Sequence, residues 1–441
     1  MSVEFAPIIR RTKPEVLAPA GSLETLKTAI DFGADAVYAG GKAFGMRAAP
    51  KNLSLEDFQE AVAYAHARSA RVFVTCNILP NNDEVAEMNQ YMGQLGEIGV
   101  DALIVSDIGV LMAAKQVAPH TEIHISTQAG ITNFQAANAF HALGASRVVL
   151  ARELDLDAIR GIRANVPADL EIEAFVHGSM CMAFSGRCLI SQHTTGRDAN
   201  HGDCAQSCRV KYHVVEEKRP NDFFPVEVTD NGTFIFNSQD MNVLTRIDEI
   251  LDAGVTSLKI EGRAKSAYYV AAMANAYKSA VNEYMVARGF ETPTGELITP
   301  FTPAAPGEER PAVEFSPWLH DEPNKVTHRE YSTGFYYPDA PASESVVRGG
   351  YINEWRWVGT VTRYDAAAGR VYLHAKNKIT PGTYIEFMFP GSAPLVHRVP
   401  ADGILDAEGM WVAEINRPAH QFSLPLDKAV PVGAMIRTRM R

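Results

Sequence analysis

The chain is poor in cysteine, with only five among its 441 residues. It also has no run of 18 or more apolar residues, which excludes a typical membrane-spanning helix. Its first fifteen residues lack the apolar core of a signal peptide, so we expect a cytoplasmic protein. Stable disulfide bonds are uncommon in that compartment. Clustered cysteines in such a chain therefore favour metal binding over disulfide bonding.

Positive charge is scarce as well. The formal net charge is −11, which argues against a general nucleic-acid-binding protein. Residues 351–441 are the exception, because they carry 11 Lys and Arg against 8 Asp and Glu. This excess is compatible with a module that faces phosphates, and an ordinary solvated tail is the alternative.

Several catalytic motifs are missing from the sequence. No G-x-G-x-x-G follows the first expected strand, which disfavours a dinucleotide-binding fold. Neither H-E-x-x-H nor G-x-S-x-G is present, so the sequence gives no support for a zinc protease or a serine hydrolase. The C-x3-C-x2-C triplet of radical adenosylmethionine enzymes is also absent.

What the chain does contain is a regular alternation of short apolar runs and amphipathic helical patterns. Eight runs read as strands: 15–20, 35–40, 71–77, 101–107, 122–128, 147–152, 171–177 and 257–262. Eight strands and their helices within about 250 residues predict an α/β fold of the (β/α)8 type, a TIM-like barrel. A doubly wound open sheet is the alternative.

The remaining segments suggest the domain organisation. We expect a barrel domain over 1–290, with a cysteine-rich insertion at 178–240. Residues 291–347 are rich in Pro, Glu, Ser and Thr and predict a partly ordered linker. Residues 348–441 contain five or six short strand patterns without a helix, which predict a small β-barrel domain.

Four of the five cysteines lie together in the insertion. Cys181, Cys188, Cys204 and Cys208 have the spacing C-x6-C-x15-C-x3-C, directly after the seventh expected strand. Thiolates are ligands for soft metals, so this cluster predicts either an iron–sulfur cluster or a structural zinc ion. Buried free cysteines are the alternative. The fifth cysteine, Cys76, lies within a strand pattern, where a core position is expected.

In a (β/α)8 barrel, function collects where the strands end at their carboxyl side. The polar residues expected at that edge are Asn77, Asp107, Gln128, Arg152 with Glu153, His177, and Glu261 with Arg263. The adjacent opposite charges could equally form local ion pairs that shape the rim. His177 could relay protons, donate a hydrogen bond to the metal site, or be a structural histidine.

One long motif resembles a known family. The stretch EAFVHGSMCMAFSGRCLIS is similar to the signature of the U32 peptidase family in its Glu, Phe, Gly, Cys and Ser positions: Glu173, Phe175, Gly178, Ser179, Cys181, Gly186, Cys188 and Ser191. The similarity extends through LAPAGSLETLKTAIDFGADAVYAG, NSQDM and SLKIEGRAKSAYYV. It covers most of 14–290 and, more loosely, the C-terminal module.

The resemblance implies an activity that the family name does not suggest. The most similar branch consists of bacterial tRNA hydroxylation proteins, which help to make 5-hydroxyuridine at the wobble position. It implies a [4Fe–4S] cluster on the four cysteines, prephenate as the source of the hydroxyl group, and the anticodon region of tRNA as partner. A peptidase or collagenase, and a non-catalytic RNA-binding factor stabilised by a metal, are the alternatives.

Prephenate is a small dicarboxylate, so its site should contain arginines that can make bidentate hydrogen bonds. Arg47, Arg152, Arg187 and Arg263 are candidates, with Lys259 on the eighth strand. Together with the other strand-end residues, the candidate catalytic set is Arg47, Gln128, Arg152, His177, Glu261 and Arg263. A tRNA partner needs only a local basic patch, which Arg187, Arg197, Arg209 and Lys211 around the cysteines could supply.

Overall fold

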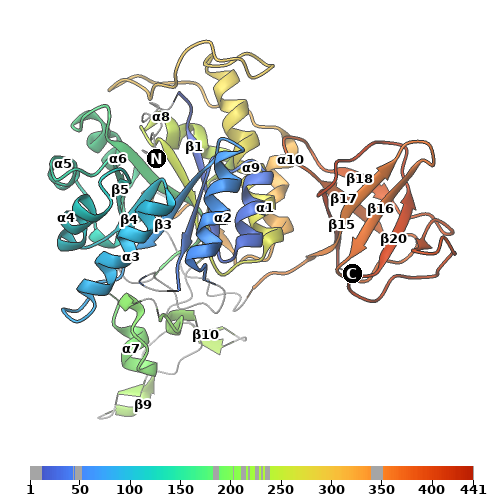
Figure 1. Ribbon diagram of the computed structural model, residues 1–441, viewed down its shortest axis with the longest axis horizontal. Helices are drawn as coiled ribbons and strands as arrows, with labels where there is room; N and C mark the ends of the chain where they lie inside the picture. The colour runs from blue at the N-terminus through green and yellow to red at the C-terminus, as the bar shows by residue number, and fades with distance from the viewer. Residues whose placement is uncertain are drawn as a thin grey trace.

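The computed structural model describes residues 12–42, 44, 52–181, 188–201, 203–209, 215–216, 219–223, 228–229, 232–233, 239–338 and 351–440; residues 209 to 233 of these are described by their backbone alone. The candidates Arg47, Arg187 and Lys211 lie outside the described residues. Figure 1 shows a large N-terminal lobe of strands and helices and a smaller C-terminal lobe of strands.

Eight parallel strands form a closed barrel in the large lobe (Figure 1). They are β1 (Glu15–Ala20), β2 (Ala36–Gly40), β3 (Arg71–Cys76), β4 (Ala102–Val105), β5 (Glu122–Ile125), β6 (Arg147–Val149), β7 (Glu171–Ser179) and β13 (Ser257–Ile260). Each strand pairs with the next, and β13 pairs in parallel with both β7 and β1. This closure confirms the predicted barrel and excludes the open sheet.

Helices cover the outside of the barrel. They are α1 (Leu23–Asp31), α2 (Leu55–His66), α3 (Val85–Ile98), α4 (Ile108–Val117), α5 (Phe134–Ala142), α6 (Leu156–Ala164), α8 (Ile247–Asp252) and α9 (Ala267–Ala287). Most begin at a Ser, Asp or Asn whose side chain accepts a hydrogen bond from the first turn, as Ser54 does for α2. Gly99 ends α3 with φ 86°, a left-handed conformation that glycine adopts without strain.

The interior of the barrel is filled by side chains. Leu17, Tyr38, Phe73 and Ile104 form a buried layer inside it, and a much larger apolar core lies between the strands and the helices. Cys76, the one cysteine outside the cluster, is fully buried in that larger core, as its strand position predicts. A filled barrel leaves its two ends as the places where polar side chains can gather.

The insertion leaves and rejoins the barrel on neighbouring strands. β12 (Asp240–Asn242) pairs antiparallel with the end of β7, with Asp240 opposite Ser179. The described elements between them are α7 (Ile190–Thr195), η2 (Ala199–His201), η3 (Ser207–Arg209), β8 (Val215–Glu216), β9 (Arg219–Phe223), β10 (Val228–Thr229) and β11 (Gly232–Thr233). Both ends of the insertion therefore lie at the carboxyl end of the barrel.

The described part of the expected linker, residues 291–338, packs on the barrel instead of crossing solvent. It forms α10 (Pro317–Asp321), η5 (Glu322–Lys325) and β14 (Tyr331–Ser332), and β14 adds to the sheet beside β12. Tyr336 is buried and donates a hydrogen bond of 2.5 Å from its hydroxyl to the Phe175 carbonyl. A few aromatic anchors thus order a segment whose average composition predicts a linker.

The C-terminal lobe is an antiparallel half-barrel with its own core, as the strand patterns predict. Its strands are β15 (Trp355–Asp365), β16 (Arg370–Ala375), β17 (Tyr384–Met388), β18 (Leu395–Arg398), β19 (Leu405–Asp406), β20 (Gln421–Pro425) and β21 (Met435–Arg439). Their order in the sheet is β18-β17-β21-β15-β16-β20-β19. A fully buried ion pair joins the lobes, because Arg437 donates to both carboxylate oxygens of Glu322 at 2.6 and 2.7 Å.

Within the part of the chain that the structure describes, no helix has the length and hydropathy needed to cross a membrane.

Candidate functional site

Four of the sequence-predicted site residues meet at the carboxyl end of the barrel. Gln128 follows β5, Arg152 follows β6, and Glu261 and Arg263 follow β13. Each of these side chains is at most 9% exposed, although all four are polar. Buried polar groups at the functional end of a barrel need partners from the protein or from a ligand.

Gln128 has an amide that is bonded at one end only. Its Oε1 lies 3.2 Å from the Ser106 hydroxyl and 3.5 Å from the Ser126 hydroxyl. At the other end Nε2 is buried and has no hydrogen-bond partner among the described residues. A buried donor left without a partner costs about 1–3 kcal/mol, so this amide is poised to bind an acceptor.

Arg152 links the barrel mouth to the cysteines. Its Nη1 donates to the Ser179 carbonyl at 3.3 Å and to Cys181 Sγ at 3.5 Å. The guanidinium stacks 3.9 Å from the centroid of the Phe175 ring, and its Nε is buried without a partner in the described part of the chain. Glu153, the neighbour that could have formed an ion pair with it, is half-buried, and burial raises the pKa of its carboxyl.

Arg263 and Glu261 form the opposite side of the mouth. Arg263 donates to Thr75 Oγ1 at 3.3 Å and to Asn52 Oδ1 at 3.2 Å. Its guanidinium takes the space that a Cβ at Gly40 would need, so a side chain there would displace the guanidinium. Glu261 accepts a hydrogen bond from the Tyr38 hydroxyl at 3.1 Å. No direct Glu261–Arg263 ion pair is found among the described contacts.

His177 is enclosed by tyrosines. Its Nδ1 lies 3.3 Å from the Tyr277 hydroxyl and its Nε2 lies 3.5 Å from the Tyr331 hydroxyl. The ring is 1% exposed, and burial lowers its pKa to about 3. Both nitrogens thus have neighbours within the protein, which favours the structural role; a catalytic role for His177 stays a prediction.

The four clustered cysteines are accessible and reduced. Cys181 and Cys204 are exposed, Cys188 and Cys208 are partly exposed, and none is in a disulfide bond. Three side-chain hydrogen bonds connect parts of the cysteine segment. The buried Ser191 hydroxyl accepts from Ala205 N at 2.9 Å, and the Thr194 and Ser207 hydroxyls are 2.7 Å apart. Asn200 donates to the Cys188 carbonyl at 3.1 Å.

This segment fits an iron–sulfur cluster by its donors. Four thiols from one segment are the usual ligand set, and hydrogen bonds to the sulfurs tune such clusters. The described contacts include two such bonds, from Arg152 to Cys181 and from the Gln206 backbone N–H to Cys204 Sγ at 3.4 Å. Among the described residues no three of these sulfurs lie within 4.8 Å of one another.

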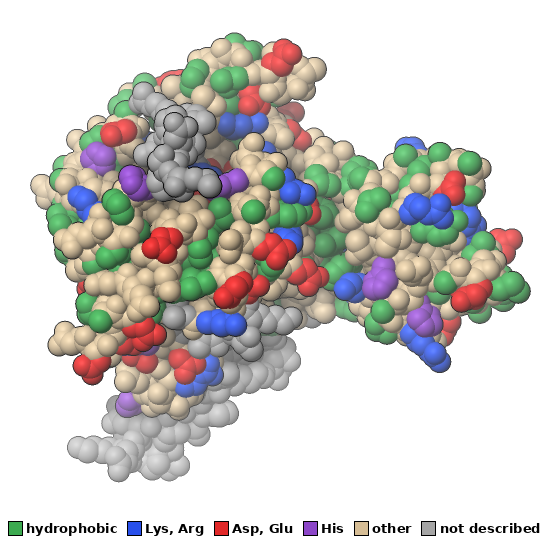
Figure 2. Space-filling view, in the orientation of Figure 1, with side chains coloured by type: hydrophobic (Ala, Val, Ile, Leu, Met, Phe, Trp, Pro, Cys, Tyr) green, Lys and Arg blue, Asp and Glu red, His purple; other side chains and the backbone are tan. Residues whose placement is uncertain are grey.

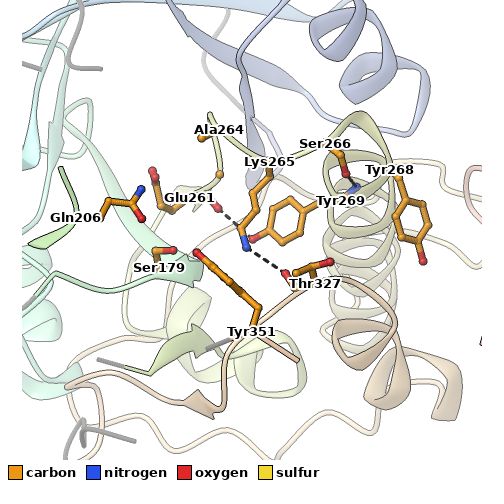
Figure 3. A pocket seen from close by; sticks show the side chains of 11 residues that line it. Ser179, Gln206, Glu261, Ala264, Lys265, Ser266, Tyr268, Tyr269, Thr327 and Tyr351 are labelled. Carbon is orange, nitrogen blue, oxygen red and sulfur yellow. Dashed lines mark hydrogen bonds between the residues drawn. The ribbon is translucent and has the colours of Figure 1, made fainter. Parts of the chain in front are cut away.

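A cavity of about 330 Å³ opens beside the cysteine segment (Figure 3). We call it the rim cavity; it is lined by Ser179, Gln206, Glu261, Gly262, Ala264, Lys265, Ser266, Tyr268, Tyr269, Thr327 and Tyr351. These residues come from the end of β7, the cysteine segment, the β13–α9 connection, the first turn of α9 and the segment that leads to the C-terminal lobe. Segments far apart in the sequence therefore share one binding-sized space.

Family models match nearly the whole chain. Residues 21–345 match peptidase family U32, and residues 353–437 match the C-terminal domain of that family. The chain belongs to peptidase family U32.

The tRNA hydroxylation protein P1 of Bacillus subtilis is 33% identical over 96% of this chain and 94% of its own length. The tRNA hydroxylation protein P of Escherichia coli is 32% identical, with 86% of each chain covered. A protein of Porphyromonas gingivalis named collagenase is 34% identical over 61% of this chain and 66% of its own.

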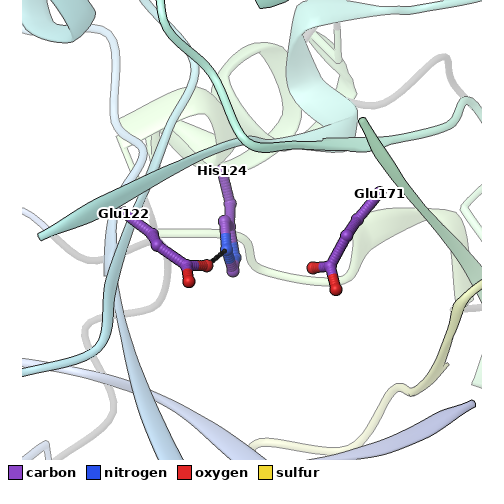
Figure 4. A group of neighbouring side chains, drawn as sticks. All are labelled: Glu122, His124 and Glu171. Atoms are coloured by element: carbon purple, nitrogen blue, oxygen red, sulfur yellow. Dashed lines mark hydrogen bonds and ion pairs between the residues drawn. The ribbon is translucent and has the colours of Figure 1, made fainter. Parts of the chain in front are cut away.

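The opposite, N-terminal end of the U32 barrel carries a second polar cluster (Figure 4). Glu122, His124 and Glu171 offer three ligand atoms within 4.8 Å of one another, which could suit a metal. Arginines already neutralise this cluster: Arg71 pairs with Glu122 at 3.0 Å, and Arg147 donates to Glu171 at 2.8 Å. We therefore regard these residues as a structural network.

Sequence reasoning missed most of the rim cavity. Lys265 lies in the recognised GRAKSAYYV stretch, and Gln206 lies between two of the cysteines, so both had a signal close by. Thr327 and Tyr351 had none, because they come from and just beyond the expected linker. Arg197, expected in a basic patch, pairs with Asp203 at 2.6 Å on the surface.

Proposed function

We propose that this chain hydroxylates the wobble uridine of tRNA to 5-hydroxyuridine, with prephenate as the source of the hydroxyl group and a [4Fe–4S] cluster on the four cysteines. The observation that carries the proposal is the match to a tRNA hydroxylation protein along 96% of the chain. The geometry supports it, since the four cysteines, a set of buried cationic side chains and a cavity meet at one end of the barrel.

Each group in the barrel mouth has a part in this proposal. Cys181, Cys188, Cys204 and Cys208 hold the cluster, which when bound supplies one-electron redox chemistry. Arg152 and Arg263 bind the two carboxylates of prephenate, because guanidinium groups recognise carboxylates by paired hydrogen bonds. The free amide end of Gln128 donates a further hydrogen bond to the same ligand.

The C-terminal lobe and the insertion are the proposed contacts for the tRNA. Residues 351–441 carry more Lys and Arg than Asp and Glu, and Figure 2 shows basic and acidic side chains mixed on the visible face of this lobe. Contacts to phosphates position an RNA without reading its sequence. The lobe would therefore hold the anticodon region against the barrel mouth, where the chemistry takes place.

Nucleoside mass spectrometry of tRNA tests the proposal. A strain that lacks the gene should lose 5-hydroxyuridine and its derivatives, and the wild-type gene on a plasmid should restore them. Purified, anaerobically prepared protein should form 5-hydroxyuridine in tRNA only when prephenate is added. Unchanged nucleosides in the deletion strain, or product formation without prephenate, would refute the corresponding part.

Peptidase activity is the second candidate, because one relative bears the name collagenase. A cysteine peptidase needs a general base beside its thiol. The described contacts of Cys181 and Cys204 are N–H donors, from Arg152 and from the Gln206 backbone, and neither group can act as a base. Cleavage of a peptide library by protein with its metal site intact, lost in Cys181→Ala, would favour the peptidase.

A further inference from the structure

The rim cavity lies beside the cysteine segment and adjoins the cationic mouth of the barrel, because Glu261 belongs to both. Ser179 precedes Cys181 by two residues, and Gln206 lies between Cys204 and Cys208. Gln206 has φ 57°, a left-handed conformation that is uncommon for a residue other than glycine. Strained residues of this kind gather at ligand-binding sites, because the surrounding structure must hold them there.

Lys265 lies between two of the three tyrosines that line the cavity, Tyr269 and Tyr351. Lys265 lies 5.0 Å from the centroid of the Tyr269 ring and 4.7 Å from that of Tyr351, and its ammonium donates to the Thr327 carbonyl at 3.0 Å. Tyr351 is 47% exposed, and Figure 3 shows its ring and the Lys265 side chain reaching into the same space from opposite sides.

The backbone beside Tyr351 is fixed. The next residue, Ile352, exchanges two backbone hydrogen bonds with His328, at 2.6 and 3.1 Å. Tyr351 is therefore held at the cavity although it belongs to the segment that enters the C-terminal lobe. A planar ligand can stack on an exposed tyrosine whose backbone is fixed, and little side-chain entropy is lost when it does.

We propose that the rim cavity receives the pyrimidine base to be modified, flipped out of the RNA and stacked on Tyr351. This inference rests on the proposed function and adds the place where the base binds. Enzymes that modify a base in a stacked nucleic acid turn it into a pocket, where an aromatic ring and hydrogen bonds to its edge hold it. The Ser179 hydroxyl and the Gln206 amide supply donors and acceptors for that edge.

The small dicarboxylate fits this cavity less well. Among the described residues that line it, Lys265 alone is cationic, and its ammonium already bonds a backbone carbonyl. Arg152 and Gln128 at the barrel mouth instead offer buried nitrogens without partners. Separate places for the anion and the base also suit a reaction that must hold two ligands at once.

A fluorine label at the reacting carbon tests the inference. An anticodon stem–loop RNA carries 5-fluorouridine at the wobble position, and its 19F resonance is followed on addition of the cluster-containing protein. Wild-type protein and Tyr351→Phe should shift the resonance as the base leaves the loop stack, and Tyr351→Ala should not. Phe134→Ala, an exposed aromatic on α5 away from the cavity, is the matched control.

Kinetics on unlabelled tRNA give the second readout. Tyr351→Ala should raise KM for tRNA roughly 5- to 150-fold, the range expected for one base–aromatic stack. KM for prephenate should stay unchanged. If Tyr351→Ala behaves like Phe134→Ala in both assays, or raises KM for prephenate alone, the inference is overturned while the proposed function stands. Wild-type protein that hydroxylates no tRNA would overturn both.

Discussion

Each end of the barrel contains a buried arginine, but the two arginines differ in how many of their donors have partners. At the N-terminal end, Arg147 is fully buried and Nη1 donates to Glu15 at 2.7 Å, to Glu173 at 2.9 Å and to Ser257 at 3.2 Å, while Nε donates to Glu171 at 2.8 Å. At the carboxyl end, Arg152 is almost as buried, yet its Nε has no partner.

The difference separates a structural site from a binding site. A buried arginine surrounded by carboxylates satisfies its donors within the protein and has nothing left for a ligand. A buried arginine with a free donor keeps a cost that a bound ligand can remove. Arg147 and Arg152 are both buried guanidinium groups, so burial alone does not separate the two ends; the completeness of the hydrogen bonding does.

The largest effect is expected at the cysteines. Alanine at Cys181, Cys188, Cys204 or Cys208 should abolish both the cluster and tRNA hydroxylation, because four thiolates hold it. Iron, acid-labile sulfide and the visible spectrum of anaerobic protein measure the cluster. Cys76→Ala, in the core, should keep full iron content. Activity and iron retained in Cys204→Ala would disprove the four-thiolate assignment.

The next effect should fall on stability at the N-terminal end. Arg147→Met should lower the free energy of unfolding by about 3–5 kcal/mol, since it leaves buried carboxylates without compensation. Urea denaturation measures the loss. Arg152→Met, at the other end, should lose less than half as much. Equal losses for the two variants would contradict the contrast between the ends.

The converse effect should appear in substrate binding. Arg152→Met and Gln128→Leu should each raise KM for prephenate about 10- to 100-fold, because a hydrogen bond to a charged group contributes about 1.5–3 kcal/mol. Steady-state kinetics with saturating tRNA measure this change. Arg160→Met, an exposed arginine on α6, serves as the control. An unchanged KM in both test variants would exclude prephenate from the barrel mouth.

A smaller, pH-dependent effect should come from His177. Its folded-state pKa of about 3 lies below the usual 6.5, so the folded protein favours the neutral ring. The resulting stability is complete above pH 6.5 and is lost as the pH falls towards 3, at about 1.4 kcal/mol per pH unit. Urea denaturation between pH 7.5 and 5 should show this slope in wild-type protein and a shallower one in His177→Gln. Equal pH dependence of the free energy of unfolding in the two proteins would contradict the assignment of this effect to His177.

The smallest effect is expected on tRNA binding, from arginines of the insertion. If Arg197 and Arg209 contact tRNA phosphates, changing each to Gln should weaken binding modestly and lower the slope of log affinity against log salt by about one. Filter binding at several salt concentrations measures it. Arg68→Gln, on the outer face beyond α2, should leave the slope unchanged. If all three variants showed the same salt dependence of tRNA binding, Arg197 and Arg209 would not belong to the RNA interface.

Much of the fold could be predicted because its signals are local. The alternation of strands and helices, the cap residues and the separate strand-rich C-terminal segment all follow from neighbouring residues. The strand-end rule also found Gln128, Arg152, Glu261 and Arg263 before their side chains were placed. The order of 291–338 was not predictable, because single aromatic anchors such as Tyr336 decide it against the average composition.

The sequence by itself determined the barrel, the half-barrel domain, the four grouped cysteines and the family. Only the tertiary structure decided which polar groups are satisfied. Arg147 and Arg152 both stand at ends of the same barrel, and nothing in their sequence surroundings tells a paired guanidinium from one with a free donor. The tertiary structure also brought Tyr351 to Gln206 and Lys265, because a cavity depends on contacts between distant segments that no local pattern records.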